Sequence, residues 1–295
     1  MRTLRRSLVP AAFLLPAIAI YSLLHIAPFL GTFGLSLFDY NGLGRPKFAG
    51  GRNYAAMLAS DSFYQALINN LVWFAGEVVV STLVGLGLAL LINARPRLAA
   101  LFRTVLFLPY ILSWAVAGML WSRILNPAPT YGMLNSLLAA IGLSDWTQNW
   151  LGDARTVLPS IIVAAIWKGF GFSMVIFLAG LQNIPAELIE AARIDGAGAA
   201  RALWHVTLPL LRPITSIVII LGLIGTFRVF DPVWVMSQGG PGTASSLLAI
   251  LVYRAGMNDF ELGYSATLSV ALFACTAIVM GLYWRIFGRR RVLDD

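Results

Sequence analysis

Long apolar runs dominate the chain, and short polar segments separate them. A helix needs about 20 mostly apolar residues to cross a bilayer, because it rises only about 1.5 Å per residue. Six runs reach this length and predict six membrane-spanning helices. They cover approximately Leu8–Phe33, Ile68–Ile92, Leu101–Ile124, Val157–Leu181, Pro213–Val235 and Leu262–Phe287. The predicted fold is therefore an all-α polytopic membrane protein, with a single transmembrane domain over 1–295.

Two further apolar stretches, Met133–Leu143 and Leu247–Met257, are too short to cross a bilayer. We expect them to form helices along the membrane interface. The basic start of the chain is also typical of a signal peptide. However, the apolar stretch from Leu8 to Leu30 is longer than the roughly 7–15 apolar residues of a signal peptide. We interpret it as an uncleaved first helix.

The distribution of basic residues predicts the orientation, because Lys and Arg are enriched at the cytoplasmic ends of spans. With the N-terminus inside, the inner segments hold Arg2, Arg5, Arg6, Arg95, Arg97, Arg103, Arg193, Arg201, Arg212, Arg285, Arg289, Arg290 and Arg291. The outer segments and outer span ends hold fewer basic residues: Arg45, Lys47, Arg52, Arg123, Arg155, Arg228 and Arg254. Both termini are therefore predicted to be cytoplasmic.

Composition agrees with a membrane protein. Hydrophobic residues make up 59% of the chain and charged residues only 12%, against about 25% charged residues in soluble domains. The net charge of +8 does not indicate nucleic-acid binding, because the basic residues lie at span ends. One cysteine, Cys275, excludes an internal disulfide, and the two distant histidines, His25 and His205, predict no metal site.

The segment between the fourth and fifth spans differs from the other connections. Pro185 suits the first turn of a helix, with Asn183 as a possible cap before it, and Glu187 and Glu190 follow where the helix dipole favours acidic groups. Gly196 and Gly198 then end the helix and permit a sharp turn. A second short helix over Ala199–Val206 completes a helix–turn–helix elbow. We expect it to lie in the cytoplasm and to dock on a partner protein.

The same segment resembles the signature of ABC importer permeases. Glu190-Ala191-Ala192 is followed after three residues by Gly196, and then after nine further residues by Val206-x-Leu208-Pro209. The family usually has isoleucine where Val206 stands. The resemblance extends over nearly the whole chain and is strongest to the carbohydrate branch, which includes the maltose, oligosaccharide and glycerol-3-phosphate permeases. Other matching stretches are Pro46–Gly50 before Asn53-Tyr54, Phe102–Pro109, Trp167–Phe170, Phe177–Gln182 and Gly239–Gly242.

This resemblance implies a type I importer permease fold in the cytoplasmic membrane of a bacterium or archaeon. It implies a first helix and outer loop over 1–64, a permease core over 65–290 and a coupling elbow over 182–212. The implied partners are an ATPase dimer, a second and different permease, and an extracytoplasmic solute-binding protein. The residues implied to couple with the ATPase are Glu190, Ala191, Ala192, Asp195, Gly196, Leu208 and Pro209.

The chain itself is not expected to be an enzyme or to bind a cofactor. It lacks the G-x-x-x-x-G-K-[ST] phosphate-binding loop, and its two lysines, Lys47 and Lys168, do not follow a glycine-rich turn of that form. ATP and Mg²⁺ are therefore expected on the partner ATPase. No Ser–His, paired Asp or H-E-x-x-H arrangement indicates an intramembrane enzyme.

Candidate residues for the solute path lie in the fourth and fifth spans. Ionisable groups inside spans are costly and usually functional, and aromatic side chains pack on the apolar faces of sugar rings. The candidates are Lys168, Gly169, Phe172, Thr226 and Phe227. A purely structural role remains open for each of them: charges within spans pair or snorkel, and aromatic rings pack between helices.

Three functions remain as alternatives. The first is the import of a sugar or related polyol. The second is the import of glycerol 3-phosphate, since Lys168 and Arg228 would favour an anion. The third is a secondary transporter, which would need carboxylates in mid-membrane for its coupling ion, where only Glu77 qualifies.

Overall fold

The computed structural model describes residues 13–94, 99–128 and 131–287. The predicted start of the first span at Leu8 and several of the predicted inner arginines lie outside these residues. The chain divides into two compact units. Unit 1 consists of Met1–Ser60 and Leu251–Ala274, and unit 2 consists of Asp61–Ile250 and Cys275–Asp295.

Unit 1 begins with an apolar helix over Phe13–Leu35, which includes a π-helical turn at Ser22–Ile26 and the segment α2 (Ala27–Leu35). A two-stranded antiparallel hairpin follows, formed by β1 (Phe38–Asp39) and β2 (Lys47–Phe48). The remaining elements of the unit are α3 (Arg52–Leu58), a π-helical turn at Arg254–Asn258 and the first part of α16 (Leu262–Phe287).

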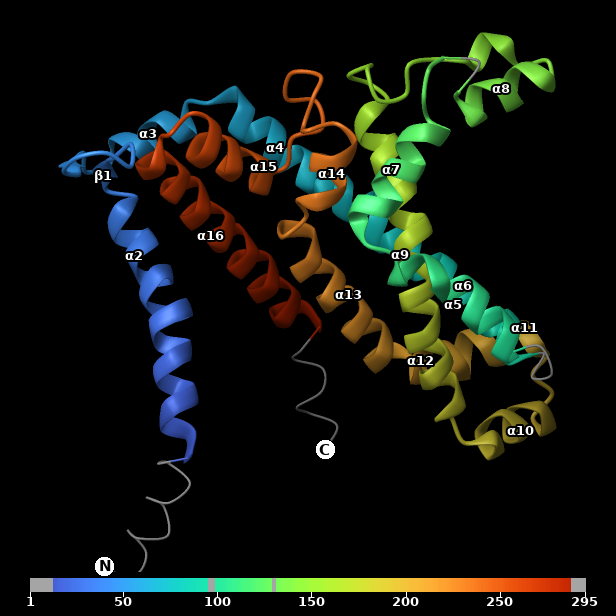
Figure 1. The fold of residues 1–295 in the computed structure, drawn as a ribbon. Helices are drawn as coiled ribbons and strands as arrows, with labels where there is room; N and C mark the ends of the chain where they lie inside the picture. The colour runs from blue at the N-terminus through green and yellow to red at the C-terminus, as the bar shows by residue number, and fades with distance from the viewer. Residues whose placement is uncertain (1–12, 95–98, 129–130, 288–295) are drawn as a thin grey trace, which may run out of the picture. The chain divides into compact units, whose positions relative to one another are not determined.

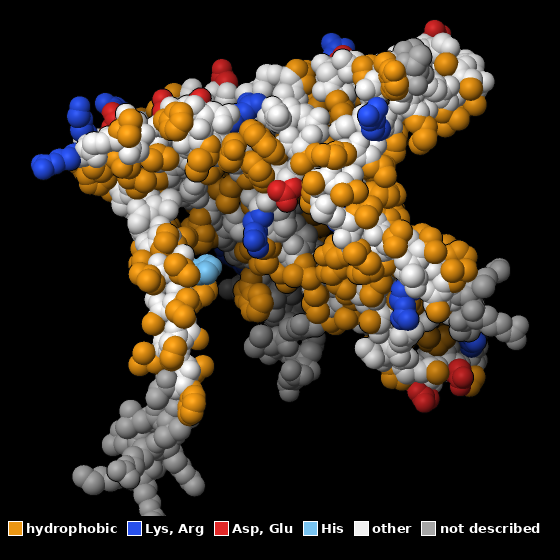
Figure 2. Space-filling view, in the orientation of Figure 1, with side chains coloured by type: hydrophobic (Ala, Val, Ile, Leu, Met, Phe, Trp, Pro, Cys, Tyr) orange, Lys and Arg blue, Asp and Glu red, His pale blue; other side chains and the backbone are white. Residues whose placement is uncertain are grey.

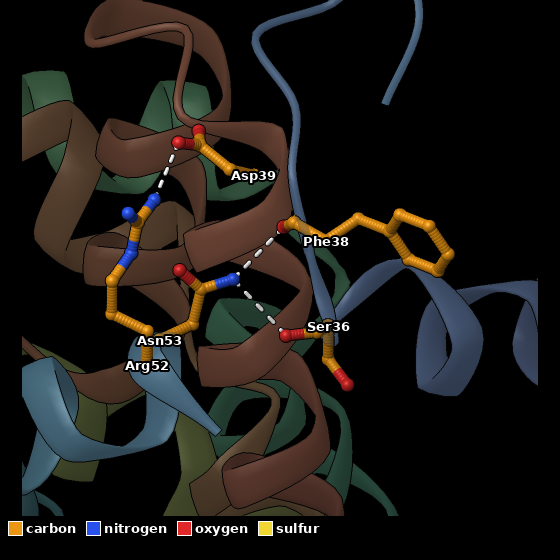
Figure 3. A network of polar contacts seen from close by, with 5 residues as sticks. All are labelled: Ser36, Phe38, Asp39, Arg52 and Asn53. Atoms are coloured by element: carbon orange, nitrogen blue, oxygen red, sulfur yellow. Dashed lines mark hydrogen bonds and ion pairs between the residues drawn. The ribbon is translucent and has the colours of Figure 1, made fainter. Parts of the chain in front are cut away.

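Asn53 holds the chain between the first helix and the hairpin in place (Figure 3). Its side-chain amide donates to the carbonyl oxygens of Ser36, at 3.0 Å, and Phe38, at 2.9 Å. Thr267 of α16 donates to the same Ser36 carbonyl at 3.1 Å. An exposed ion pair between Arg52 and Asp39 adds little stability, because water screens both charges. The buried amide of Asn53 therefore links α3, the hairpin and the end of the first helix.

Replacing Asn53 with aspartate should destabilise unit 1, because both donors would be lost and a carboxylate would face two carbonyl oxygens. Leaving buried polar groups unsatisfied costs about 1–3 kcal/mol. Asn41→Asp is the matched control, since the Asn41 side chain is an acceptor from the Leu43 amide and aspartate keeps that bond. Limited proteolysis of the purified chain should cut the hairpin of Asn53→Asp much faster. Equal rates in the two variants would contradict this role.

Unit 2 is built around α9 (Val157–Gln182), which is buried over more than half of its apolar length. The helix packs against α5 (Val80–Asn93) and α6 (Ala99–Ile111) (Figure 1). Large apolar side chains around Ile161 and Phe177 form two core clusters along it. The other helices of the unit are α4 (Asp61–Trp73), α7 (Trp114–Ile124), α8 (Met133–Ala140), α10 (Ala186–Ile194), α11 (Ala199–Ala202), α12 (Leu208–Leu210), α13 (Arg212–Phe227), α14 (Asp231–Met236), the start of α15 (Leu248–Tyr253) and the second part of α16.

Small residues allow the helices of unit 2 to approach closely. A β-carbon added at Gly85 of α5 would lie 2.6 Å from the Ser173 Cβ and 2.8 Å from the Met174 backbone nitrogen of α9. A β-carbon added at Gly171 of α9 would lie 2.3 Å from the Leu106 carbonyl oxygen of α6. Such contacts between backbones are typical of helix packing in membranes. The hydrophobic effect does not drive helices together there, and small residues instead allow close packing.

Two neighbouring asparagines of α4 tie together segments that are distant in sequence. The buried Asn70 amide donates to the Thr226 carbonyl oxygen at 3.0 Å, and its oxygen accepts from the Leu248 amide at 3.0 Å. Asn69 donates to the carbonyl oxygens of Ala244 and Ser246, at 3.0 and 2.8 Å. The α4 helix thereby fixes the end of α13 and the start of α15.

The expectation of a helical membrane protein is confirmed. Among the residues that the structure describes, four helices are long and apolar enough to span a membrane: Phe13–Leu35, Asp61–Asn93, Val157–Gln182 and Leu262–Ile286. Two bent pairs bring the number to six if each pair is one span: Ala99–Ile111 with Trp114–Ile124, and Ala199–Leu210 with Arg212–Phe227. Figure 2 shows hydrophobic side chains over much of the visible helix surface. In Phe13–Leu35 no residue of the apolar stretch is buried in the chain itself, as suits contact with lipid or another subunit.

Two predicted spans are wrong as continuous helices. The third span breaks between Ile111 and Trp114 with a bend of 94°, where the Ser113 side chain caps the start of α7. The fifth ends at Phe227 rather than Val235. Pro232 explains that end, because it has no N–H group and its ring would clash with the carbonyl four residues earlier. The short helices predicted near Met133 and Leu247 are present as α8 and as α15 with its following π-helical turn.

Candidate functional site

A cavity of about 460 Å³ lies beside the middle of α9 in unit 2. Four segments line it: the region of the π-helical turn between α4 and α5, the break between α6 and α7, α9 itself, and α13 with the residues directly after it. Small-molecule sites usually occupy about 300–1,000 Å³. The cavity therefore has the size of a small-molecule site.

Aromatic rings form a large part of the cavity wall. The rings of Tyr110 and Phe172 are stacked, with centroids 4.9 Å apart and an angle of 16° between their planes. Trp73, Trp114 and Phe230 also line the cavity. These rings offer broad apolar faces of the kind that binds small molecules with apolar surfaces.

Equal numbers of acidic and basic side chains line the cavity. Two are acidic, Glu77 and Asp231, and two are basic, Lys168 and Arg228. Within the described residues no ion pair joins any of these four to one another, and no cluster of three His, Cys, Asp or Glu side chains could hold a metal ion. The cavity thus has no excess of positive charge that would favour an anion.

Of the two acidic groups, Glu77 is the one that lies in the middle of a helix, the one over Asp61–Asn93. Its carboxylate accepts a long hydrogen bond of 3.4 Å from the Ser81 hydroxyl one turn later. It lies close to the α9 backbone, because a β-carbon added at Gly169 would be 2.6 Å from its Oε1 atom. Gly169 therefore provides the space that the carboxylate occupies. The remaining lone pairs of Glu77 are suited to accept hydrogen bonds from hydroxyl groups.

Lys168 is buried, with only 9% of its surface exposed. Its ammonium donates to the Tyr110 carbonyl oxygen at 2.6 Å. The same nitrogen lies 5.1 Å from the centroid of the Tyr110 ring and 5.4 Å from that of Trp114. Both distances fall within the range of cation–π interactions.

Three of the five path candidates named from the sequence line this cavity: Lys168, Gly169 and Phe172. Thr226 and Phe227 do not line it and are buried. The Thr226 hydroxyl donates to the Gly222 carbonyl within α13, and its own carbonyl accepts from Asn70. These two side chains therefore do not face this cavity, and their place in the solute path stays a prediction. The face of α13 that lines it carries Val218, Leu221, Gly222 and Gly225.

Tyr110 and Trp114 were missed as cavity residues by the sequence reasoning. They flank the helix break, which hydropathy does not reveal. The available signal was local: Pro109 followed by Ser113, a residue type that often caps a helix.

The elbow forms a second candidate site. α10 begins after Pro185, and the Asn183 side chain does not cap it. At its end the Ala197 amide donates to the Ala192 carbonyl at 2.8 Å, and the Gly196 amide donates to the Arg193 carbonyl at 3.0 Å. This pair of bonds is a Schellman motif. Gly196 has the positive φ of +82° that the motif needs.

The second arm of the elbow is longer than predicted. It runs over Ala199–Leu210, with a π-helical turn at Leu203–Thr207, and bends by 61° into α13. Leu208 and Pro209 thus lie within this helix rather than after it. Gly198 only precedes the arm, with φ of −66°, a value open to any residue.

The elbow presents both apolar and charged groups. Glu190, Ala191 and Asp195 are exposed, whereas Ala192 is half-buried. Ile194 is 86% exposed and Trp204 is 68% exposed. Figure 2 shows acidic side chains at the end of the molecule where Figure 1 places α10.

Comparisons with known proteins agree with a fold of membrane-spanning helices. Residues 81–292 match the model of the family described as "Binding-protein-dependent transport system inner membrane component". The probable ABC transporter permease protein YurN of Bacillus subtilis is 33% identical over 96% of this chain and 97% of its own length. The trehalose/maltose transport system permease protein MalF of Thermococcus litoralis is 32% identical over 94% of this chain and 93% of its own length.

A solved structure shares the fold. It is the crystal structure of a bacterial ABC transporter involved in the import of the acidic polysaccharide alginate. The matching chain has a TM-score of 0.85 at 21% identity and is covered to 99%, with 100% of this chain aligned. Permeases of this family are transport subunits and not enzymes. From the family match and the relatives, this chain belongs to the inner membrane components of binding-protein-dependent transport systems.

Proposed function

We propose that this chain is the channel-forming permease of an ABC importer that moves a neutral sugar or oligosaccharide inward. The cavity beside α9 carries the proposal. Its stacked aromatic pair, Tyr110 and Phe172, suits the apolar face of a sugar ring, and the Glu77 carboxylate suits hydroxyl groups. Two relatives support a carbohydrate: the trehalose/maltose transport system permease protein MalF, and the arabinooligosaccharides transport system permease protein AraP of Bacillus subtilis.

The charge of the cavity favours a neutral solute over glycerol 3-phosphate. An anion would need free basic groups, but the cavity contains as many acidic as basic side chains. Lys168 is already engaged by the Tyr110 carbonyl. Of the two basic groups only Arg228 is left exposed.

The energy for solute import is proposed to come from a separate ATPase that binds ATP and Mg²⁺. In this proposal the elbow docks on the ATPase, and Glu190 offers an ion pair to a basic residue of that partner. The exposed Ile194 and Trp204 are the apolar part of the contact. The family resemblance supports a complex that also contains a second permease and an extracytoplasmic solute-binding protein. In such a complex the elbow and both termini face the cytoplasm.

Reconstitution of the complex in proteoliposomes tests this function. The chain would be combined with its partner ATPase, second permease and solute-binding protein. Radiolabelled maltose, an arabinooligosaccharide and glycerol 3-phosphate would be offered separately. We expect uptake of a neutral saccharide that requires both ATP on the elbow side and the binding protein on the other side. Uptake of glycerol 3-phosphate alone would favour the anion importer. Uptake by this chain alone, driven by an ion gradient, would overturn the importer assignment.

A further inference from the structure

The broken span between α6 and α7 is unusual because its bend lies at the wall of the cavity. α6 ends at Ile111 and α7 begins at Trp114, and their axes are bent by 94°. The last carbonyl groups of a helix have no partner within that helix. Tyr110 is in this last turn, so its carbonyl oxygen needs a donor from elsewhere. Inside a membrane water is scarce, and the protein must provide that donor.

Lys168 provides the donor and contacts both arms of the bend. Its ammonium bonds the Tyr110 carbonyl at 2.6 Å, at the end of α6. It also lies over the Tyr110 ring of α6 and the Trp114 ring at the start of α7. A cation at the C-terminal end of a helix also complements the helix dipole. One charged group from α9 therefore holds the end of one helix and the beginning of the next.

A buried ammonium in a membrane-spanning helix is costly. In the described part of the chain no carboxylate lies within ion-pair distance of Lys168. Its charge is offset by one carbonyl group and two aromatic rings instead, and all of these belong to the two arms of the bend. This arrangement is therefore specific for the bent form, because straightening the span would separate the lysine from part of its partners.

We propose that Lys168 is a clamp that fixes the angle between α6 and α7, and so positions the aromatic wall of the cavity. In this assignment Lys168 acts through Tyr110 and Trp114 and is a positioning residue rather than a ligand of the solute. The inference does not depend on which solute crosses the membrane. It also explains why the lysine is directed at the helix break although it lies beside the cavity.

The angle of the bend can be measured directly. Val105 of α6 and Met119 of α7 are both exposed, so cysteines at these positions accept spin labels in a Cys275→Ser background. Double electron–electron resonance on the full-length chain in lipid nanodiscs then reports the distance across the bend. A straight helix would separate the two positions by about 21 Å along its axis. We expect one narrow, shorter distance with Lys168, the same distance with Lys168→Arg, and a broader and longer distribution with Lys168→Met.

Lys47→Met is the matched control, because it removes the other lysine of the chain from an exposed strand in unit 1. It should leave the distance unchanged. If Lys168→Met does not insert stably, Trp114→Leu removes one of the two rings and should broaden the distribution in the same direction. An unchanged distribution in whichever of these two variants inserts would overturn the clamp.

Uptake by the reconstituted complex separates positioning from solute binding. Lys168→Met should lower uptake at least severalfold, and Lys168→Arg should restore most of it, because arginine also donates to a carbonyl and stacks on aromatic rings. If Lys168→Arg transported as poorly as Lys168→Met while its spin-label distance matched that of the parent chain, Lys168 would act on the solute itself. That result would overturn the assignment of Lys168 as a positioning residue.

Discussion

Replacing Gly196 with valine should nearly abolish ATP-driven transport while leaving the chain inserted in the membrane. Gly196 closes α10 with φ of +82°, a conformation that a β-branched residue adopts only with strain of about 1–3 kcal/mol. Among the described residues, no atom outside its immediate neighbours lies within 4 Å of a β-carbon added there. The loss of transport should therefore come from the backbone, because a changed φ at residue 196 would turn the second arm of the elbow away from its native direction.

The coupling free energy between two sites typically corresponds to a factor of roughly 5–150. We expect ATPase stimulation and uptake to fall by a factor in this range. The measurement is ATPase stimulation by solute-loaded binding protein, together with uptake, in the reconstituted complex. Gly198→Ala is the matched control. Gly198 lies two residues later, also has open space around a β-carbon, and has an ordinary φ of −66°. Full stimulation and uptake with Gly196→Val would show that this turn does not couple the permease to an ATPase.

Alanine at two neighbouring glycines of α5 should change stability in opposite directions. At Gly85 the new methyl group would collide with the Met174 backbone of α9, and overpacking of this kind costs about 1–3 kcal/mol. At Gly87 a β-carbon meets nothing within 4 Å. There alanine should instead stabilise the helix by up to about 1 kcal/mol, because it loses less backbone entropy than glycine.

Thermal unfolding of the purified chain in detergent measures this difference. Gly85→Ala should lower the midpoint by roughly 2–10 °C, whereas Gly87→Ala should leave it unchanged or raise it slightly. Because both substitutions add the same group to the same helix, the contrast isolates the contact with α9. A similar midpoint for both variants would mean that α5 and α9 are not held together at this point by close backbone packing.

Hydropathy predicted the membrane-spanning segments because length and apolar content decide whether a helix can cross a bilayer. It did not predict the break after Ile111, since Leu112 and Ser113 interrupt the helix without interrupting the apolar run. The elbow was predictable from local signals, because Pro185 and Gly196 act within a few residues of their own positions.

The composition of the cavity was only partly predictable. Lys168 and Phe172 were chosen because charge and aromatic rings are conspicuous in a span, and they do line the cavity. Thr226 and Phe227 were chosen on the same grounds, but their orientation depends on the rotation of α13. That rotation depends on packing against helices distant in sequence and on the bond from Asn70 to the Thr226 carbonyl. No periodicity within a single helix contains this information.

The paired asparagines of α4 have a consequence for how the chain is made. Asn70 bonds groups that lie 156 and 178 residues further along, and Asn69 bonds a carbonyl 177 residues further along. At a synthesis rate of about 5–20 residues per second, roughly 8–30 s pass between the emergence of Asn70 and that of Thr226. During this time its amide lacks its native partners in the growing chain. The second span must therefore be held by the insertion machinery, by water or by temporary bonds. The bonds of Asn70 cannot all form before the segment up to Leu248 has been synthesised.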